Sequence, residues 1–467
     1  MDLFNKHKSL TLKHRAIIIN WILEVVNEYD LKHNTFQLAV CILDKYLILE
    51  EKNIPLNEIQ YISVVCIVIA SKLVDENVFT IKDANYVSKN ECGQYLLLQK
   101  EKEILEKLGY QINYKTVWQH IKNNGTKISA DVFKITYYLT CIMLIHPDYI
   151  SIPTRELTNK IIKFAIVTNK NHLKIPKLSK KDVIYKYLHC MWSIATINTK
   201  LSEVKNIFTD LGIYYTLKKY LLEMGPIFEG NVNNKYGNKF DTLSNINLPN
   251  CNKSNTNKIY EINNDFGIPK EVLNELVKLI SIKKHPNIIS IDSYYYDIDN
   301  GKLSLGYKIK CSITDRLSQL STNKFKLNLI RQFLIGVKHL CDNKIIPINL
   351  SIDNLFLDKN NNLKIKNDFR SLDSELLSHK KIYFAGSVIW SCGYIIGHIL
   401  LGHRLFESTY EDSEKESTQF TELDKKYPEI SKIIRAMLSP HIIQPDINTV
   451  INFFNNVKLI KIYKQPF

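Results

Sequence analysis

Thiol chemistry is the first chemistry that the reactive residues suggest, and their spacing argues against it. The chain of 467 residues holds nine cysteines, and no two of them form a Cys-x-x-Cys pair. Several lie inside apolar runs of helical periodicity, where a free cysteine behaves as a small hydrophobic residue. An odd and scattered set of cysteines is typical of a reducing compartment. We therefore expect no disulfide framework and no metal site.

Two charged residues, Lys72 and Glu101, stand out because each ends or interrupts an apolar helical run. Charged side chains at such places are either solvated or form a mutual salt bridge, which contributes little on a protein surface. The alternative is that they bind a partner. The residue types alone leave both interpretations open.

The elements that must position these residues are helices. Residues 15–222 contain few glycines and show apolar periodicity over helix lengths. The first helix has apolar residues on more than the single stripe of a surface helix. Such a helix is either central in a core or carries a second face that binds a partner. Polar or proline-containing breaks are predicted at residues 50–55, 75–79, 123–127, 152–153 and 169–180.

Composition limits the number of domains and the kinds of partner. The length predicts two or three domains, and an apolar content of 45% is enough for substantial cores. The lysines behind the net charge of +15 are dispersed, so we interpret them as solvated and do not expect a nucleic-acid partner. No apolar run is expected to reach membrane-spanning length, and residues 1–14 do not resemble a signal peptide. We expect an intracellular protein, cytoplasmic or nuclear, without a membrane partner.

Four segments of the N-terminal part resemble the cyclin box in their order and spacing. Residues 14–24 read His-Arg-Ala-Ile-Ile-Ile-Asn-Trp-Ile-Leu-Glu, and residues 38–47 read Leu-Ala-Val-Cys-Ile-Leu-Asp-Lys-Tyr-Leu. The third segment, residues 59–76, contains Ala-Ser-Lys before its end, and the fourth, residues 100–110, begins Lys-Glu-Lys-Glu-Ile-Leu. The resemblance implies an all-α cyclin fold and, as partner, a cyclin-dependent kinase.

The same resemblance implies roles for particular residues. The residues matching Lys72 and Glu101 hydrogen-bond in cyclins to the backbone around the C-helix of the kinase. Arg15 and Asp44 match an ion pair that stabilises the fold, and Asn20 stands where the family has an aspartate. A shallow groove that takes short basic-x-leucine peptides of substrates or inhibitors is implied at Ile17, Ile18, Trp21, Glu24, Ile59 and Gln60.

From residue 258 onward the chain resembles a cyclin-dependent kinase. Residues 267–275 read Gly-Ile-Pro-Lys-Glu-Val-Leu-Asn-Glu, as the kinase C-helix does, and a His-Pro-Asn-Ile turn follows. The resemblance places Glu275 where kinases have the glutamate that pairs with a strand lysine near ATP. Tyr260 stands at the place of that lysine. Lys258 lies two residues earlier, on the same face of the strand, and is a candidate substitute.

The residues that would perform phosphoryl transfer are altered. In the stretch resembling the catalytic loop, residues 345–358, Asn349 replaces the base aspartate and Ser351 the lysine, whereas Asn354 is retained as the metal-ligating asparagine. An amide cannot accept the hydroxyl proton of a substrate, so the general base is lost. Either Asn367 or, with one residue inserted, Asp368 takes the place of the metal-binding aspartate.

The sequence thus predicts a multidomain protein: an all-α cyclin fold of two helical repeats followed by an α+β bilobal kinase-like domain. We expect a cyclin-type regulator of a cyclin-dependent kinase, either a separate chain or its own kinase-like domain, with that domain inactive. The alternative is an ATP-dependent serine/threonine kinase activated in cis. The residues retained establish no cofactor, and they are compatible with binding of Mg-ATP. The predicted boundaries are a cyclin box at 1–111, a second repeat at 112–225, a flexible linker at 226–257 and the kinase-like domain at 258–467.

Overall fold

The contacts between residues divide the chain into two compact units. The first unit comprises Met1–Asn247, Tyr260–Val277 and Tyr296–Leu303, and the rest of the chain forms the second. Two stretches of the kinase-like region therefore belong, by their contacts, to the N-terminal unit. The computed structural model describes residues 6–89, 93–123, 129–145, 149–150, 152–170, 188, 257–282, 284–319, 322–343, 345–347, 350–366, 369–371, 381–405, 413–439 and 443–457.

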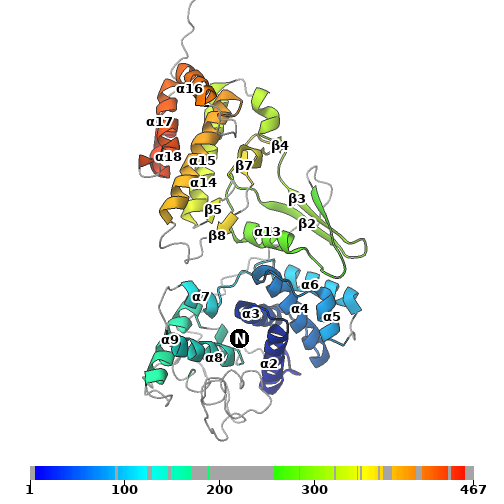
Figure 1. Ribbon diagram of the computed structural model, residues 1–467. Helices are drawn as coiled ribbons and strands as arrows, with labels where there is room; N and C mark the ends of the chain where they lie inside the picture. Colours follow the sequence, from blue (N-terminus) through cyan, green and yellow to red (C-terminus); the bar gives the residue numbers. More distant parts are fainter. Residues whose placement is uncertain are drawn as a thin grey trace, which may run out of the picture. The chain divides into compact units, whose positions relative to one another are not determined.

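The N-terminal unit is helical up to residue 170, as the periodicity predicts (Figure 1). The observed breaks at residues 50–55 and 75–80 agree with two of the predicted ones. The predicted linker at 226–257 lies outside the described residues except for Asn257. The helices are α2 (Leu12–Glu28), α3 (His33–Leu49), α4 (Leu56–Val74), α5 (Ile81–Val87), α6 (Gly93–Lys107), α7 (Val117–Asn123), α8 (Ala130–Met143) and α9 (Thr154–Lys170).

Helix α4 is the centre of this unit. It contacts α2, α3, α5 and α6, and its residues from Ile62 to Lys72 are all buried. Among the described residues, α4 alone has the length and apolar composition to cross a membrane, with 67% of its apolar window buried within the protein. The expectation that no apolar run reaches spanning length is therefore wrong for α4. Its burial among four helices accounts for the apolar composition, because a core helix is apolar on every side.

Helix α2 carries one buried and one exposed face, so it is not a core helix surrounded on every side. Ile19 and Ile22 have no exposed surface, whereas Ile17 on the other face is 40% exposed. The helix begins with a capping box in which the Thr11 side chain accepts a hydrogen bond from the His14 amide and the His14 ring accepts one from the Thr11 amide. This box fixes where the helix starts and which residues lie on its exposed face.

A buried ion pair joins α2 to α3 and to the residues that follow α8. The Arg15 guanidinium binds both oxygens of the Asp44 carboxylate, at 2.9 Å for the longer bond. Arg15 also donates to the carbonyl oxygens of Leu144 and Ile145, both at 2.9 Å, and the Tyr149 hydroxyl donates to Asp44 at 2.7 Å. Both charges are thus paired and hydrogen-bonded, as burial requires.

The remainder of the chain is α+β. The sheet of β1 (Asn257–Glu261), β2 (Ile291–Asp297) and β3 (Lys302–Tyr307) has the order β1-β3-β2, and α13 (Lys270–Ser281) lies between β1 and β2 in the chain. Two small antiparallel sheets follow, β4-β6-β7 and β5-β8. Their strands are β4 (Cys311–Ser312), β5 (Ile345–Pro347), β6 (Leu355–Leu357), β7 (Leu363–Ile365) and β8 (Phe369–Ser371).

Helices supply the core of the second unit. Phe333 and Val337 of α14 and Ile395 and Ile399 of α15 have no exposed surface. The Asn287 side chain of the His-Pro-Asn-Ile turn donates to the Leu363 carbonyl at 3.0 Å, which fixes this turn to β7. The helices are α14 (Asn323–Asp342), α15 (Lys381–Leu401), α16 (Ser413–Lys426), α17 (Pro428–Leu438) and α18 (Ile447–Asn456), with short 3-10 turns at Thr314–Gln319 and Ile352–Asn354.

We predict that Asp44→Asn lowers the free energy of unfolding by about 3–5 kcal/mol, because it leaves the Arg15 charge buried without a counter-charge. Chemical denaturation followed by circular dichroism measures this loss. Glu76→Gln is the matched control, since Glu76 pairs with Lys32 while 93% of its side chain is exposed, and surface pairs contribute little. Equal losses in the two variants would contradict the structural role of the buried pair.

Candidate functional site

Lys72 and Glu101 form a buried ion pair rather than solvated charges. The Lys72 ammonium lies 2.5 Å from Oε1 of Glu101, and the side chains are 2% and 0% exposed. Burial lowers the pKa of Lys72, and the Glu101 carboxylate opposes that shift. A buried pair is tolerated when further hydrogen bonds satisfy its remaining atoms. The stability of the pair therefore depends on which donor binds the second oxygen of Glu101.

That second oxygen accepts a backbone hydrogen bond from the kinase-like region. Oε2 of Glu101 lies 3.1 Å from the amide nitrogen of Ile268, which is itself completely buried. Ile268 precedes Pro269, and α13 begins at Lys270, as expected for a helix that starts just after proline. The two residues singled out from sequence thus lie together and bind the segment just ahead of α13.

Gly267 is a residue of this site that the sequence analysis quoted but did not assign a role. Its φ is +66°, a conformation that side chains other than glycine rarely adopt. A Cβ atom there would overlap Oε2 of Glu101 and lie 3.1 Å from the Lys72 ammonium. Glycine is therefore required twice, by the backbone turn and by the close approach of the carboxylate.

Side chains of α13 reach the C-terminal end of α4. The Lys270 ammonium donates to the carbonyl oxygens of Asp75 and Glu76, and the Asn274 amide donates to the carbonyl of Lys72 at 3.2 Å. These contacts extend the site from the Glu101 carboxylate along one side of α13.

A second set of contacts joins α5 and α6 to the segment between β1 and α13, to the end of β2 and to the loop that follows β2. The Lys82 amide donates to the Asp265 carbonyl at 3.0 Å. The Tyr95 hydroxyl donates to Asp299 at 2.8 Å, and the Lys102 ammonium donates to the Tyr296 carbonyl at 2.8 Å. Tyr296 is buried, and this burial together with the nearby Glu101 carboxylate raises its pKa.

Glu275 faces a neutral donor. The Tyr260 hydroxyl donates to Oε2 of Glu275 at 3.0 Å, and burial together with this carboxylate raises the pKa of Tyr260. The phenol therefore stays protonated at neutral pH and supplies no positive charge for a phosphate. Lys258 lies on β1, and its side chain is outside the described residues.

The predicted catalytic positions are described only in part. Asn349, Asn367 and Asp368 lie outside the described residues. Asn354 ends a short 3-10 turn before β6, and its carbonyl accepts the amide of Lys366 at 2.8 Å. The Ser351 side chain caps this turn by accepting the Asp353 amide at 3.2 Å. Within the described ranges no group of three or more metal-ligating side chains occurs.

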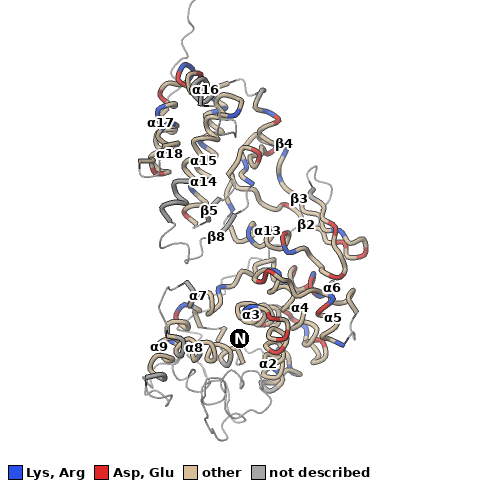
Figure 2. Tube along the Cα trace, in the orientation of Figure 1, with Lys and Arg blue, Asp and Glu red and all other residues tan. Residues whose placement is uncertain are grey.

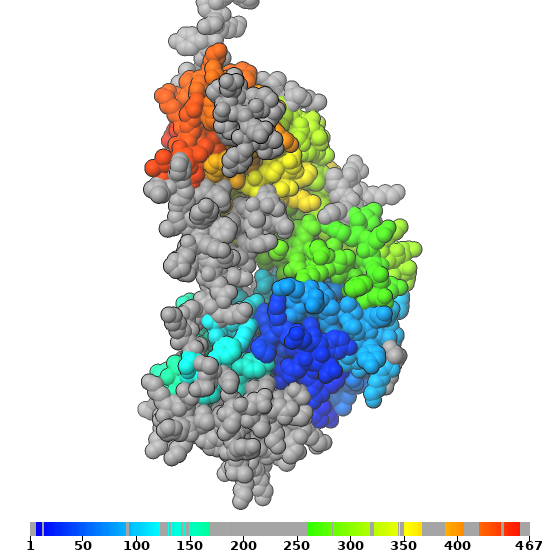
Figure 3. All heavy atoms as spheres, in the orientation of Figure 1, coloured from blue at the N-terminus to red at the C-terminus, as the bar shows by residue number. Residues whose placement is uncertain are grey.

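The predicted peptide groove is brought together only in part. Ile17 and Gln60 are exposed and Ile18, Trp21 and Glu24 are half-buried, but Ile59 has no exposed surface. A residue without exposed surface supports the face from below and does not contact a peptide. Atoms of the first helices, in dark blue, reach the surface in the space-filling view (Figure 3).

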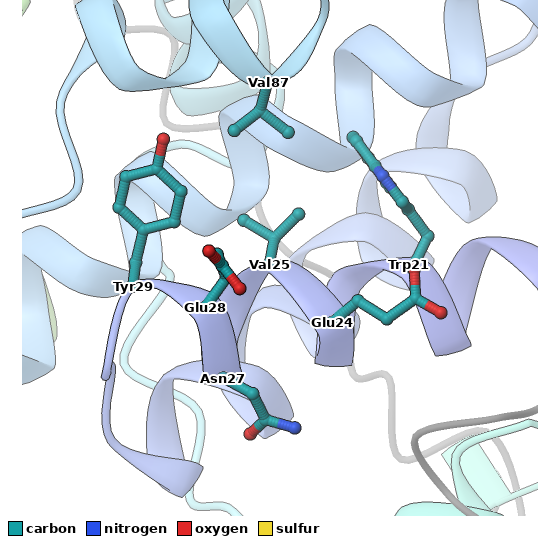
Figure 4. Close-up of a pocket in the computed structure, with 7 residues that line it drawn as sticks. All are labelled: Trp21, Glu24, Val25, Asn27, Glu28, Tyr29 and Val87. Carbon is teal, nitrogen blue, oxygen red and sulfur yellow. The ribbon is translucent and has the colours of Figure 1, made fainter.

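A hollow of about 460 Å³ lies beside this face. Trp21, Glu24 and Glu28 of α2 line it, and Val87 of α5 faces them, whereas the Asn27 side chain points away (Figure 4). The Asn20 amide donates to Glu24 at 2.6 Å, which orients one of the two carboxylates. The hollow therefore combines an aromatic ring with negative charge.

Comparison with known proteins accounts for this geometry. The family profile described as cyclin, N-terminal domain, matches residues 1–113. The N-terminal unit of this chain contains a cyclin box. The G2/mitotic-specific cyclin-B3 of Caenorhabditis elegans is 30% identical over 132 residues, which cover 28% of this chain and 34% of that protein.

The cyclin box is fused to a kinase-like region. A protein of Acanthamoeba polyphaga mimivirus named "Putative serine/threonine-protein kinase L673" is 26% identical over 476 residues, covering 88% of this chain and 86% of that protein. The X-ray structure of a viral cyclin from herpesvirus saimiri aligns with 45% of this chain and 92% of its own, at 22% identity and a TM-score of 0.32. The family profile and the mimivirus relative together confirm the predicted fold class, a cyclin fold followed by a kinase-like domain.

Gly267→Ala should release the segment ahead of α13, because a methyl group would displace the Glu101 carboxylate. Limited trypsin digestion of the full chain measures this release as faster cleavage after Lys270. Gly93→Ala is the matched control, since Gly93 also has a positive φ, +72°, but nothing lies within 4 Å of its Cβ position.

Both variants carry the backbone strain of a positive φ, and only Gly267→Ala adds the collision. We expect cleavage after Lys270 to accelerate in Gly267→Ala and to stay at the wild-type rate in Gly93→Ala. Equal cleavage rates in all three proteins would show that the Glu101 contact does not hold the segment.

Proposed function

We propose that this chain is a cyclin-type regulator whose cyclin box binds the C-helix segment of its own kinase-like region. The observation that carries the proposal is the Glu101 carboxylate, which accepts the Ile268 amide while it pairs with buried Lys72. Cyclins resemble this chain at both residues, and in cyclins they bind the corresponding segment of a separate kinase. Here the segment belongs to the same chain.

Covalent connection favours the intramolecular arrangement. A flexible tether gives its two ends an effective concentration in the millimolar range. A separate cyclin-dependent kinase would have to displace the attached segment before it could use Lys72 and Glu101. Binding of an external kinase through this face is therefore the competing arrangement, and it requires release of residues 265–277.

We further propose that the kinase-like region regulates without transferring phosphate. Tyr260 supplies a neutral hydroxyl to Glu275 where kinases have a lysine, and Asn349 cannot act as a base. Phosphoryl transfer relies on positioned charges around the nucleotide, so each loss removes a large factor from the rate. An active kinase that carries its activator in cis remains the alternative, and the name of the mimivirus relative, a serine/threonine-protein kinase, favours it.

The full chain should transfer no phosphate above background from Mg-ATP to a generic serine/threonine substrate. A radiometric assay on purified protein measures this, and a thermal shift with Mg-ATP reports nucleotide binding separately. Phosphorylation that disappears in an Asp368→Ala variant would establish the cis-activated kinase instead. A thermal shift without phosphorylation would mean that nucleotide binding persists without catalysis.

Removing both charges of the buried pair should release the segment while the cyclin box stays folded. In Lys72→Met/Glu101→Leu the pair is replaced by apolar groups of similar volume, which is often neutral or stabilising for the fold. The acceptor for the Ile268 amide is lost. Amide hydrogen exchange on the full chain should therefore speed up at residues 265–276, while exchange in α3 and α4 stays slow.

Unchanged exchange at residues 265–276 in that double variant would overturn the proposal. Faster exchange throughout α3 and α4 would mean that the variant has lost its fold. In that case Gly267→Ala, which leaves both charges in place, provides the same comparison.

The hollow beside α2 favours a second binding function for the cyclin box. Its two carboxylates and the Trp21 ring fit a basic side chain next to an apolar one, which agrees with the basic-x-leucine peptides implied by the cyclin resemblance. Such a peptide would be contributed by a substrate or an inhibitor. This site is separate in sequence from Lys72 and Glu101, so the two functions do not exclude each other.

Glu24→Gln should weaken binding of a labelled Arg-x-Leu peptide to the full chain by about tenfold, because hydrogen bonds to a charged group contribute about 1.5–3 kcal/mol. Fluorescence anisotropy measures the affinity. Glu51→Gln, which removes an exposed carboxylate away from the hollow, serves as control. Equal affinities for the two variants would show that the hollow does not bind this peptide.

A further inference from the structure

The end of α4 presents a group of backbone acceptors. The helix ends at Val74, and the last carbonyl groups of a helix have no partner within it. These carbonyls also carry the partial negative charge of the helix dipole, which attracts cations. The carbonyl oxygen of Lys72 belongs to this group, and those of Asp75 and Glu76 follow directly after the end of the helix.

The chain holds these acceptors in a defined position. The Asp75 carboxylate accepts the Lys32 amide at 2.9 Å and the Thr35 hydroxyl at 2.6 Å, and Asp75 is only 5% exposed. The backbone that follows α4 is therefore fixed by α3 and does not depend on α13. A fixed site loses little entropy when a donor binds it.

Lys270 supplies a cation to this end of the helix. Its ammonium donates to the Asp75 carbonyl and, at 3.3 Å, to the Glu76 carbonyl. An ammonium group has three donors and no acceptor, so it can serve two carbonyls at once. Such charge-assisted hydrogen bonds are about twice as strong as neutral ones.

Asn274 supplies the second donor from the next turn of α13. Its amide nitrogen donates to the Lys72 carbonyl at 3.2 Å and to the Lys270 carbonyl at 2.9 Å. Residues four apart lie on the same face of a helix. Lys270 and Asn274 therefore present their donors side by side to the end of α4.

In these contacts, the amino-acid sequence of α13 matters and the sequence of the cyclin box does not. On the cyclin box the partners are backbone carbonyls, which every amino-acid sequence provides. On α13 the partners are side chains, and only residues with donors can replace them. A C-helix without donors at the positions of Lys270 and Asn274 would form no hydrogen bonds with the carbonyl oxygens at the end of α4.

We propose that Lys270 and Asn274 are the specificity-determining residues by which the cyclin box selects its own segment over a C-helix that lacks these two donors. This inference rests on the proposed function, because it assumes that the segment docks on the cyclin box in solution. The Glu101 carboxylate contacts only the backbone of Gly267 and Ile268. It therefore holds the segment in place but does not distinguish the side chains that follow.

The test uses the full chain and amide hydrogen exchange at residues 265–276. Lys270→Met keeps the length of the side chain and removes its donors, and Asn274→Asp keeps its shape and replaces the donor by an acceptor. Each should speed up exchange by roughly tenfold or more. Lys270→Arg retains the donors and should keep the wild-type rate, as should Glu271→Ala at the exposed neighbouring position.

The outcomes separate this inference from the proposed function. A protected wild-type segment whose exchange is unchanged in both donor-removing variants would overturn the role of Lys270 and Asn274 and leave the docking intact. Exchange that is as fast in Lys270→Arg as in Lys270→Met would overturn it as well, because it would indicate packing and not donation. A wild-type segment without protection would overturn the docking itself and the inference with it.

Discussion

The site depends on one carboxylate that serves two partners. Glu101 neutralises the buried ammonium of Lys72 with one oxygen and accepts the Ile268 amide with the other. Two buried charges are costly to desolvate, and they are tolerated only when their hydrogen-bonding capacity is satisfied. Without the Ile268 amide the second oxygen would need water or another donor. A backbone amide at this position therefore stabilises the buried Lys72–Glu101 pair.

The other features of the site follow from the hydrogen bond between the Ile268 amide and the Glu101 carboxylate. A carboxylate that approaches the backbone so closely leaves no room for a side chain, which accounts for Gly267 and its positive φ. Pro269 then starts α13 immediately, so that Lys270 and Asn274 fall beside the end of α4. The Arg15–Asp44 pair joins the first helices to the residues around Leu144 in a similar way, by a guanidinium that also donates to two carbonyls. Figure 2 shows that the lysine, arginine, aspartate and glutamate residues are spread along the described chain.

Sequence reasoning identified Lys72 and Glu101 because each charge interrupts an apolar helix and because both match cyclins. It also anticipated the helical breaks at residues 50–55 and 75–79. It could not give the partner of Glu101, because Ile268 lies 167 residues further along the chain and contributes only its backbone. Backbone groups have no sequence signal. The same reason hid the role of Lys270, whose partners are the carbonyls of Asp75 and Glu76.

Other features were outside the reach of the sequence for different reasons. The burial of Ile59 depends on how α4 is surrounded, which periodicity cannot specify for a helix that is apolar on all sides. The hydrogen bond from Tyr260 to Glu275 links a strand to a helix, and the motif comparison showed only that a lysine was missing. Sequence reasoning also missed that α4 is apolar enough to span a membrane. Polar residues interrupt its apolar run in the sequence, although most of the helix is buried in the fold.

In our proposal, the face of the cyclin box that contains Lys72 and Glu101 is occupied by the chain's own segment, residues 265–277. Native mass spectrometry of the full chain mixed with a purified cyclin-dependent kinase tests it most directly, with Gly267→Ala measured in parallel as a chain whose segment is released. The account predicts that the wild-type chain remains free of kinase at micromolar concentrations, because the tethered segment competes at a far higher effective concentration. A one-to-one complex of the wild-type chain with the kinase, formed together with rapid trypsin cleavage after Lys270, would contradict it.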